Sequence, residues 1–160
     1  MAAWDRFFKH PTFFRHALNI WPPFLGAGIT VDHVSSDFRQ VTVRLKDRVV
    51  NRNYVGSHFG GSLFAMTDPF YMLMFIQNLG SKYYVWDLRS NIEFVDPAYG
   101  TIRADFIIDD ERLSRVQKGT ASGEKFEDTF IIELKNSSGE VVSRVEKVLY
   151  FRLKPKYRPS

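Results

Sequence analysis

Hydrophobic and polar residues alternate along six segments of the chain, which is the period of strands that bury one face. These segments are residues 28–36, 40–50, 90–96, 100–109, 128–136 and 141–153. The last two are separated by Ser-Ser-Gly-Glu at positions 137–140, so they are predicted to form a long hairpin.

Residues 58–80, HFGGSLFAMTDPFYMLMFIQNLG, break this alternation. The segment is too long for a strand and rich in Phe, Met and Leu, which predicts a buried helix. Pro69 lacks a backbone donor and disfavours a helical conformation at Asp68, so we expect a kink there. Gly80 is a suitable C-cap.

Residues 4–21 carry aromatic and apolar side chains at roughly helical spacing, interrupted at Pro11. Residues 22–28, PPFLGAG, predict a turn. The polar residues 109–128 predict a short helix and a loop.

A helix that is apolar on all sides needs a sheet that curls around it. The element order therefore predicts an α+β protein of the hotdog fold, a curved antiparallel sheet wrapped around one long central helix. We expect a single domain over residues 1–160, with an N-terminal helical extension at 1–20 and a basic tail at 153–160.

The composition fits one soluble globular domain: 160 residues, 44% hydrophobic and 25% charged. The absence of cysteine excludes disulfides and a cysteine nucleophile. The N-terminus has no secretory pattern, and Asp68 and Pro69 lie mid-way along the apolar segment. We therefore expect a cytoplasmic protein without membrane insertion.

The net charge of +4 is concentrated in residues 151–160, FRLKPKYRPS. A solvated tail, nucleic acid or a phosphorylated small molecule would each explain it, and we expect no nucleic acid partner. His10, His16 and His33 lie in unrelated segments with no acidic partner at ligand spacing, so no metal site is expected.

The residues Asn53, Gly56, Gly60, Gly61 and Asp68 follow the spacing Asn-x2-Gly-x3-Gly-Gly-x6-Asp. This spacing resembles that of the hotdog acyl-CoA thioesterases, in the branch that includes phenylacetate-pathway enzymes. A second block, NIEFVDPAYG at 91–100, resembles the following strand of that family. The resemblance covers roughly residues 18–152 and is closer still to an uncharacterised bacterial subgroup.

The resemblance implies that Asp68 acts as general base or nucleophile, that the Gly60 N–H stabilises an oxyanion, and that Asn53 orients water or substrate. A helix start offers free N–H donors and glycine allows close approach, which suits this chemistry. Each residue also has a structural interpretation: Asp68 as a cap, Asn53 as a turn residue, and Gly60 as a packing residue.

Further residues near the motif are expected to contact substrate: Gly61, His58, Phe59 and Asp87. Two of them depart from the family pattern. Phe59 stands where the family usually has histidine, and Asp87 stands where animal relatives have serine. Asp87 would orient water, or pair with Arg89 or Arg52.

These departures keep open a non-catalytic acyl-CoA or lipid-binding protein as an alternative to the thioesterase. A hydro-lyase of the same fold would need Asp and His about five residues apart before the helix, and the chain has no such pair. The expected partner is an acyl-CoA or acyl-carrier thioester, with coenzyme A as part of the substrate and no separate cofactor. Open strand edges and the resemblance together imply a homodimer with shared sites, and tetramers built from two such dimers are common in the family.

Overall fold

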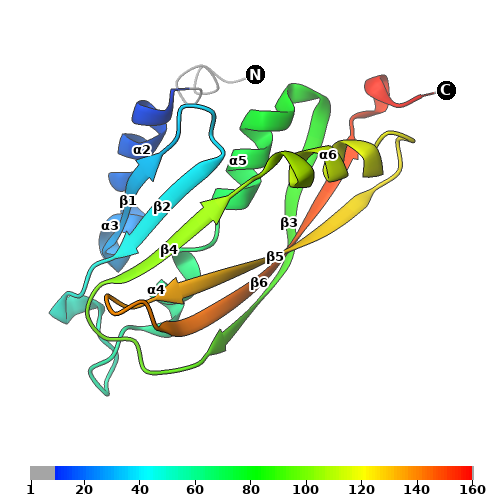
Figure 1. Cartoon of the computed structure of the whole chain (residues 1–160). Helices are drawn as coiled ribbons and strands as arrows, with labels where there is room; N and C mark the ends of the chain where they lie inside the picture. Colours follow the sequence, from blue (N-terminus) through cyan, green and yellow to red (C-terminus); the bar gives the residue numbers. More distant parts are fainter. Residues whose placement is uncertain (1–9, 160) are drawn as a thin grey trace.

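A six-stranded antiparallel sheet forms the frame of the molecule, with strand order β1-β2-β4-β5-β6-β3 (Figure 1). The computed structural model describes residues 10–159. The strands are β1 (Ile29–Val34), β2 (Gln40–Leu45), β3 (Tyr83–Phe94), β4 (Ile102–Ile107), β5 (Phe126–Lys135) and β6 (Val141–Leu153). The α-helices are α2 (Pro11–Asn19), α3 (Pro22–Ala27), α4 (Gly60–Ala65), α5 (Phe70–Leu79) and α6 (Asp110–Gly119).

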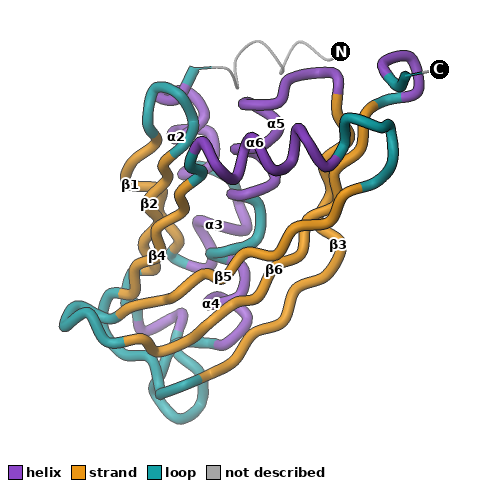
Figure 2. The backbone as a smooth tube through the Cα atoms, turned by 45° about the vertical axis from the view of Figure 1, so that its right-hand side comes forward, coloured by secondary structure: helices purple, strands orange, loops and turns teal. Residues whose placement is uncertain are grey.

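The sheet opens between β4 and β5, where only Arg103 and Ala104 pair with Lys135 and Leu134. The β1–β2–β4 half and the β5–β6–β3 half diverge from this junction, and α5 lies between them (Figures 1 and 2). Helix α6 connects β4 to β5 across the open end. The wide opening is what allows the sheet to enclose a helix.

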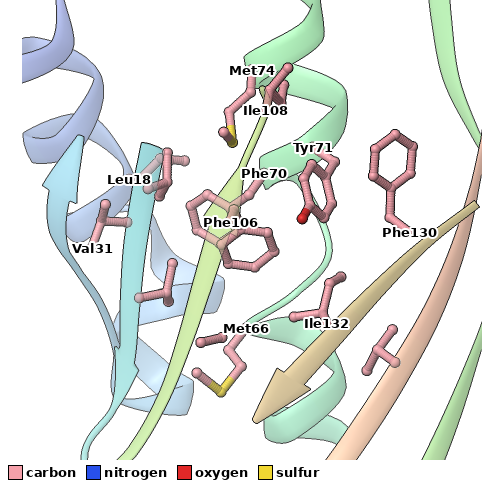
Figure 3. Packing of buried hydrophobic residues seen from close by; sticks show 14 of the residues in the cluster. Leu18, Val31, Met66, Phe70, Tyr71, Met74, Phe106, Ile108, Phe130 and Ile132 are labelled. Carbon is pink, nitrogen blue, oxygen red and sulfur yellow. The ribbon is translucent and has the colours of Figure 1, made fainter. Parts of the chain in front are cut away.

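Aromatic rings of α5 fill the space between the two halves (Figure 3). The Phe70 ring lies 4.9 Å from that of Phe106 on β4, and the Tyr71 ring lies 4.4 Å from that of Phe130 on β5. Because α5 is apolar on nearly every side, burying it between both halves of the sheet supplies much of the hydrophobic stabilisation.

The predicted hotdog architecture, with its curved sheet and central helix, is confirmed. The prediction of a turn at residues 22–28 is wrong, because Pro22 and Pro23 occupy the first positions of α3 and Gly28 ends it with a φ of 76°. Strand β3 begins at Tyr83, seven residues before the predicted start at residue 90. It is an edge strand, so its hydrophobic alternation is weak.

The predicted helix at 4–21 corresponds to α2 from Pro11 onward, and residues 4–9 lie outside the described part. Phe14 and Leu18 of α2 are buried in the core. The Asn19 side chain bonds both the N–H and the carbonyl of Val31, at 2.6 and 3.0 Å. The described part of this helix is thereby fixed to β1.

In the part of the chain from residue 10 to residue 159, no helix is both long and apolar enough to cross a membrane.

Candidate active site

The predicted helix of residues 58–80 is interrupted at Asp68 and Pro69, between α4 and α5. The α5 hydrogen-bond ladder begins with Leu73 N–H donating to the Pro69 carbonyl, at 3.0 Å. Asp68 therefore lies one residue before the ladder, and its carbonyl is free to accept a donor from elsewhere. The predicted kink is a complete break between two helices.

Lys147 provides that donor from the neighbouring sheet. Its Nζ lies 2.7 Å from the Asp68 carbonyl oxygen, 3.5 Å from Asp68 Oδ1 and 3.0 Å from Asp87 Oδ2. The Lys147 side chain is 1% exposed. A buried ammonium is stable only with partners that compensate its charge, and these three acceptors surround it.

Asp87 reaches Lys147 because of an irregularity in β3. The pairing of β3 with β6 shifts register between Asp87 and Arg89, which leaves Leu88 as an extra residue. Such bulges redirect neighbouring side chains and often border functional sites. Asp87 therefore pairs with Lys147 and with neither of the two arginines considered from the sequence. Arg89 lies 3.7 Å from Glu127, and Arg52 pairs with Asp47.

The two carboxylates of the site have different environments. Burial raises the pKa of Asp87, and the charge of Lys147 opposes this shift only in part. Its Oδ1 atom is buried with no hydrogen-bond partner among the described residues. The Asp68 side chain is 65% exposed, although the residue lies in an otherwise apolar segment. The site thus presents one accessible carboxylate beside a second that is partly buried.

Gly60 and Gly61 begin α4 at the other end of the same helical segment. A Cβ on Gly60 would lie 2.9 Å from the Phe94 ring, and one on Gly61 would lie 2.3 Å from the Phe59 ring. The first α4 bonds are donated by Ser62 and Leu63 to the Phe59 carbonyl. The N–H groups of Gly60 and Gly61 come before them, and neither has an acceptor within residues 10–159.

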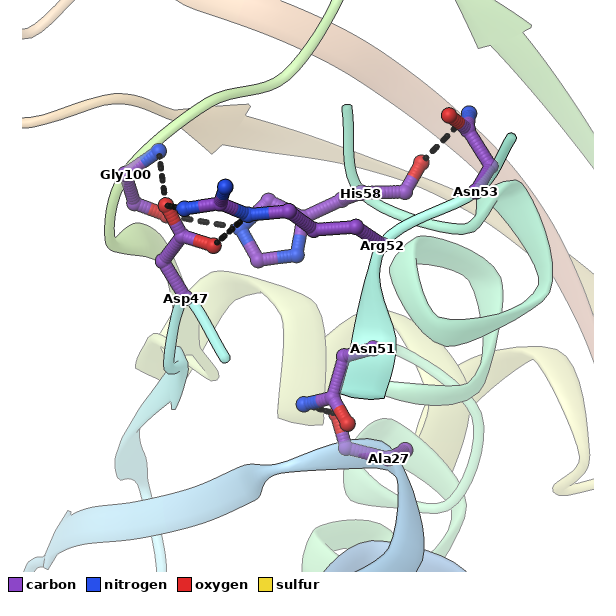
Figure 4. A network of polar contacts seen from close by, with 7 residues as sticks. All are labelled: Ala27, Asp47, Asn51, Arg52, Asn53, His58 and Gly100. Atoms are coloured by element: carbon purple, nitrogen blue, oxygen red, sulfur yellow. Dashed lines mark hydrogen bonds and ion pairs between the residues drawn. The ribbon is translucent and has the colours of Figure 1, made fainter. Parts of the chain in front are cut away.

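The loop that leads into α4 is held by polar contacts (Figure 4). Arg52 donates two bonds to Asp47, at 2.9 and 3.0 Å, which lowers the pKa of that carboxyl. Asp47 accepts from the Gly100 N–H, and His58 Nε2 lies 2.6 Å from the Gly100 carbonyl oxygen. His58 is buried, and its imidazole faces the β3–β4 connection that contains Gly100, not solvent.

Asn53 stabilises a turn in the same loop. Its Oδ1 accepts from the Val55 N–H at 3.1 Å, and its Nδ2 donates to Ser57 Oγ at 2.8 Å. All hydrogen-bonding atoms of this side chain are thus engaged within the loop, as in the turn interpretation of this residue.

Within one protomer the predicted residues form two groups. Asp68 and Asp87 meet at Lys147, whereas Gly60, Gly61 and Phe59 gather at the start of α4. Gly60 and Asp68 are eight positions apart in sequence. Gly60 begins α4, which is about 9 Å long at a rise of about 1.5 Å per residue, and Asp68 lies three residues past its end, so the two are too far apart to contact one carbonyl group.

Lys147 is the residue of the candidate site that the sequence reasoning missed. In β6 it shares the inward face with Val145, Leu149 and Phe151, all of which are buried. A lysine at an apolar position of a strict alternation is the signal that could have identified it.

A helix enclosed by a strongly curved antiparallel sheet, with polar residues at a break in that helix, defines a hotdog-fold protein. A Pseudomonas aeruginosa protein of unknown function, described as a probable thioesterase, shares this fold with a TM-score of 0.79. It is 24% identical, and the alignment covers 90% of this chain and 97% of that one.

The family model for the domain of unknown function DUF4442 matches residues 10–151, so the chain belongs to this family. The PaaI protein from the phenylacetic acid degradation operon of E. coli has the same fold, with a TM-score of 0.60 and 16% identity over 87% of this chain and 90% of that one. A Haemophilus influenzae thioesterase matches with a TM-score of 0.65 and 13% identity, over 92% of this chain and 94% of that one. No curated protein matches the sequence.

Proposed function

We propose that this protein hydrolyses acyl thioesters, with acyl-CoA as the substrate class. The observation that carries the proposal is the accessible Asp68 carboxylate at the helix break. The backbone carbonyl of this residue accepts a hydrogen bond from the buried ammonium of Lys147. Burying a lysine is costly, and here it fixes the backbone of the residue that the family resemblance assigns to catalysis. The hotdog fold of this chain is also that of proteins described as thioesterases.

In the proposed reaction, Asp68 removes a proton from water as the water oxygen bonds to the thioester carbonyl carbon. The carbonyl oxygen becomes an oxyanion, which backbone N–H groups at a helix start stabilise. The intermediate collapses, the carbon–sulfur bond breaks, and the thiolate leaves and takes up a proton. Direct attack by the Asp68 carboxylate would give an anhydride that water then hydrolyses, with the same products.

The oxyanion donor in this proposal is Gly60 of a second copy of the chain, because Gly60 of the same protomer is too distant from Asp68. Strand β3 is the edge at which the copies would pair. It is 12 residues long, and its neighbouring residues Trp86 and Leu88 are 59% and 46% exposed. A long, open, apolar edge strand is suited to pairing across a two-fold axis.

A non-catalytic acyl-CoA-binding protein is the second candidate. It is favoured by Phe59, which is 58% exposed beside Gly61 where the family usually has histidine. It is also favoured by Asp87, which bonds Lys147 where animal relatives have serine. Such a protein would bind acyl-CoA without turning it over.

The decisive experiment is a thioesterase screen over aromatic, short-chain and long-chain acyl-CoA substrates, with Asp68→Asn as the test variant. We expect turnover of at least one substrate, and loss of that turnover in a variant whose thermal unfolding matches the wild type, because Asp68 is exposed. Full activity in Asp68→Asn would remove Asp68 from the mechanism. Saturable binding without hydrolysis across the panel would favour the binding protein.

A further inference from the structure

Exposed apolar side chains gather where α3 meets the segment that follows β2. Ile20, Trp21 and Leu25 are 71%, 44% and 51% exposed, and Val49 and Val50 are 81% and 85% exposed. We call these five residues the apolar patch. Single apolar side chains are common on protein surfaces, but several of them on two adjoining segments are typical of an interaction site.

Hydrogen bonds hold the two segments of the patch together. The Asn51 side chain donates to the Ala27 carbonyl at 2.7 Å, and the Lys46 N–H donates to the Gly28 carbonyl at 3.0 Å. The 3-10 helix η1 (Val49–Asn51) contains both valines of the patch, so they lie next to the residue that bonds α3. Figure 1 shows α3 at the end of the sheet where β1 begins and β2 ends.

The outward position of the α3 side chains has a packing cause. Phe24 is the buried residue of this helix, and its ring lies 5.9 Å from that of Phe70. The Leu25 N–H donates to the Trp21 carbonyl at 3.0 Å, so these two residues lie one helical turn apart on one face. Because Phe24 fixes the rotation of α3, Trp21 and Leu25 are held at the surface.

The charged residues beside the patch leave an excess of positive charge. Lys46 and Arg48 lie within three positions of Val49, and neither forms an ion pair within residues 10–159. Asp47 stands between them, but both of its oxygens accept hydrogen bonds from Arg52. Exposed apolar side chains beside uncompensated cations are the combination that binds a bilayer with anionic lipids.

The same charges disfavour a second copy of the chain as the occupant of the patch. A two-fold contact through the patch would bring Lys46 and Arg48 of both copies together without a counter-ion. The patch also offers no strand edge to an extended peptide, because it is formed by α3, η1 and the turn before α3. A bilayer needs neither a matching protein surface nor a free strand edge.

We propose that the apolar patch attaches the protein to the surface of bilayers that contain anionic lipids. The apolar side chains enter the boundary between head groups and acyl chains, where a tryptophan such as Trp21 is especially stable. Lys46 and Arg48 contact the lipid phosphates. Contact of this kind is peripheral and needs no spanning helix.

Attachment through α3 would bring the candidate active site close to the membrane. The Phe24 ring packs against Phe70, which begins α5 two positions after Asp68. A thioester whose long acyl chain lies in the bilayer would then be near the helix break. This consequence for substrate supply rests on the proposed function, whereas the membrane contact itself does not.

The first test measures binding to vesicles of phosphatidylcholine alone and to vesicles of an equimolar mixture with phosphatidylglycerol. Leu25→Ser combined with Val50→Ser removes two aliphatic side chains from the patch. The matched control is Ile107→Ser combined with Ile131→Ser, because these residues are 58% and 55% exposed on β4 and β5. We expect wild type and control to bind the mixed vesicles, and the patch variant to bind them about tenfold more weakly.

The second test concerns the charges. Lys46→Gln with Arg48→Gln is compared with Lys118→Gln with Lys156→Gln, which also removes two positive charges from the protein. The first pair should weaken binding to the mixed vesicles by about tenfold to thirtyfold relative to the second. Wild-type binding to phosphatidylcholine alone should be weaker by a similar factor.

The third test leaves the patch intact. The chain has three tryptophans, so replacing Trp4 and Trp86 with phenylalanine makes Trp21 the sole emitter. Brominated lipids in the mixed vesicles should quench its fluorescence and shift its emission to shorter wavelength. Vesicle binding without quenching of Trp21 would overturn the inference, because the protein would then be attached through another surface.

Absence of wild-type binding to the mixed vesicles would also overturn the inference, as would equal binding by each variant and its control. If Leu25→Ser with Val50→Ser abolishes self-association in light scattering but leaves vesicle binding unchanged, the patch is an interface between copies and the inference fails. No thioester is present in these measurements, so their outcome is independent of whether the protein is a hydrolase.

Discussion

Replacing Lys147 with methionine removes the ammonium while keeping an unbranched side chain of similar length. The change leaves the Asp68 carbonyl without its donor and Asp87 without its counter-ion. Breaking a buried ion pair on one side costs about 3–5 kcal/mol of unfolding free energy. The Asp87 side chain is 24% exposed and can take up a proton, so we expect a cost near the lower limit.

A loss of about 3 kcal/mol corresponds to a decrease in Tm of roughly 6–12 °C for a chain of this size. The assay is urea unfolding, followed by kcat and KM on the best acyl-CoA substrate. We expect kcat to fall by more than tenfold, because Asp68 is no longer fixed at the helix break. Leu45→Ala is the control for stability alone, since Leu45 is fully buried in β2, in the other half of the sheet.

The double variant Lys147→Met with Asp87→Asn separates stability from positioning. Removing both charges leaves no uncompensated ion, so most of the lost stability should return. Activity should not return, because the Asp68 carbonyl still lacks its donor. Recovery of both properties would show that Lys147 only neutralises Asp87, and a Lys147→Met variant identical to the wild type would refute the reasoning entirely.

Three further outcomes follow from the structure. Gly60→Ala should lower the unfolding free energy by about 1–3 kcal/mol, because the new methyl group would lie 2.9 Å from the Phe94 ring; an unchanged urea midpoint would contradict this packing. Burial raises the folded-state pKa of Asp87 above its usual value of 3.8, so unfolding releases a proton just above that pH. Wild-type stability should therefore fall relative to Asp87→Asn as the pH rises through this window, and parallel pH curves would refute it. Trp86→Lys should weaken dimerisation by about thirtyfold or more, as measured by light scattering, whereas the control Ile131→Lys on the outer face of β5 should not. A wild-type protein that stays an active monomer would rule out the shared site.

The sequence was sufficient for the architecture, because alternation and the apolar central segment are local patterns. The strand at 141–153 matches its predicted bounds, since both faces of that hairpin have a clear period. The start of β3 was harder to predict. An edge strand with an exposed outer face and a bulge at Leu88 does not keep a single period.

The sequence alone could identify only part of the candidate site. Asp68 stands out as a single carboxylate beside proline in an apolar segment. Its contact with Lys147 joins residues 79 positions apart, and no local pattern encodes that pairing. The exposure of the Asp68 side chain could not be anticipated either, because the residue stands in an otherwise apolar segment.

The narrow junction between β4 and β5 has a mechanical consequence. Two residue pairs hold the halves of the sheet together, while α5 fills the space between them. The two halves can therefore separate at this junction while the strand pairing within each three-stranded half stays intact. Amide hydrogens on β4 beyond Ala104 that face β5, and not β2, should exchange with solvent faster than those at the centre of the β5–β6 ladder. For the proposed acyl-thioester substrate, a long acyl chain would be accommodated by separation of the two halves at this junction.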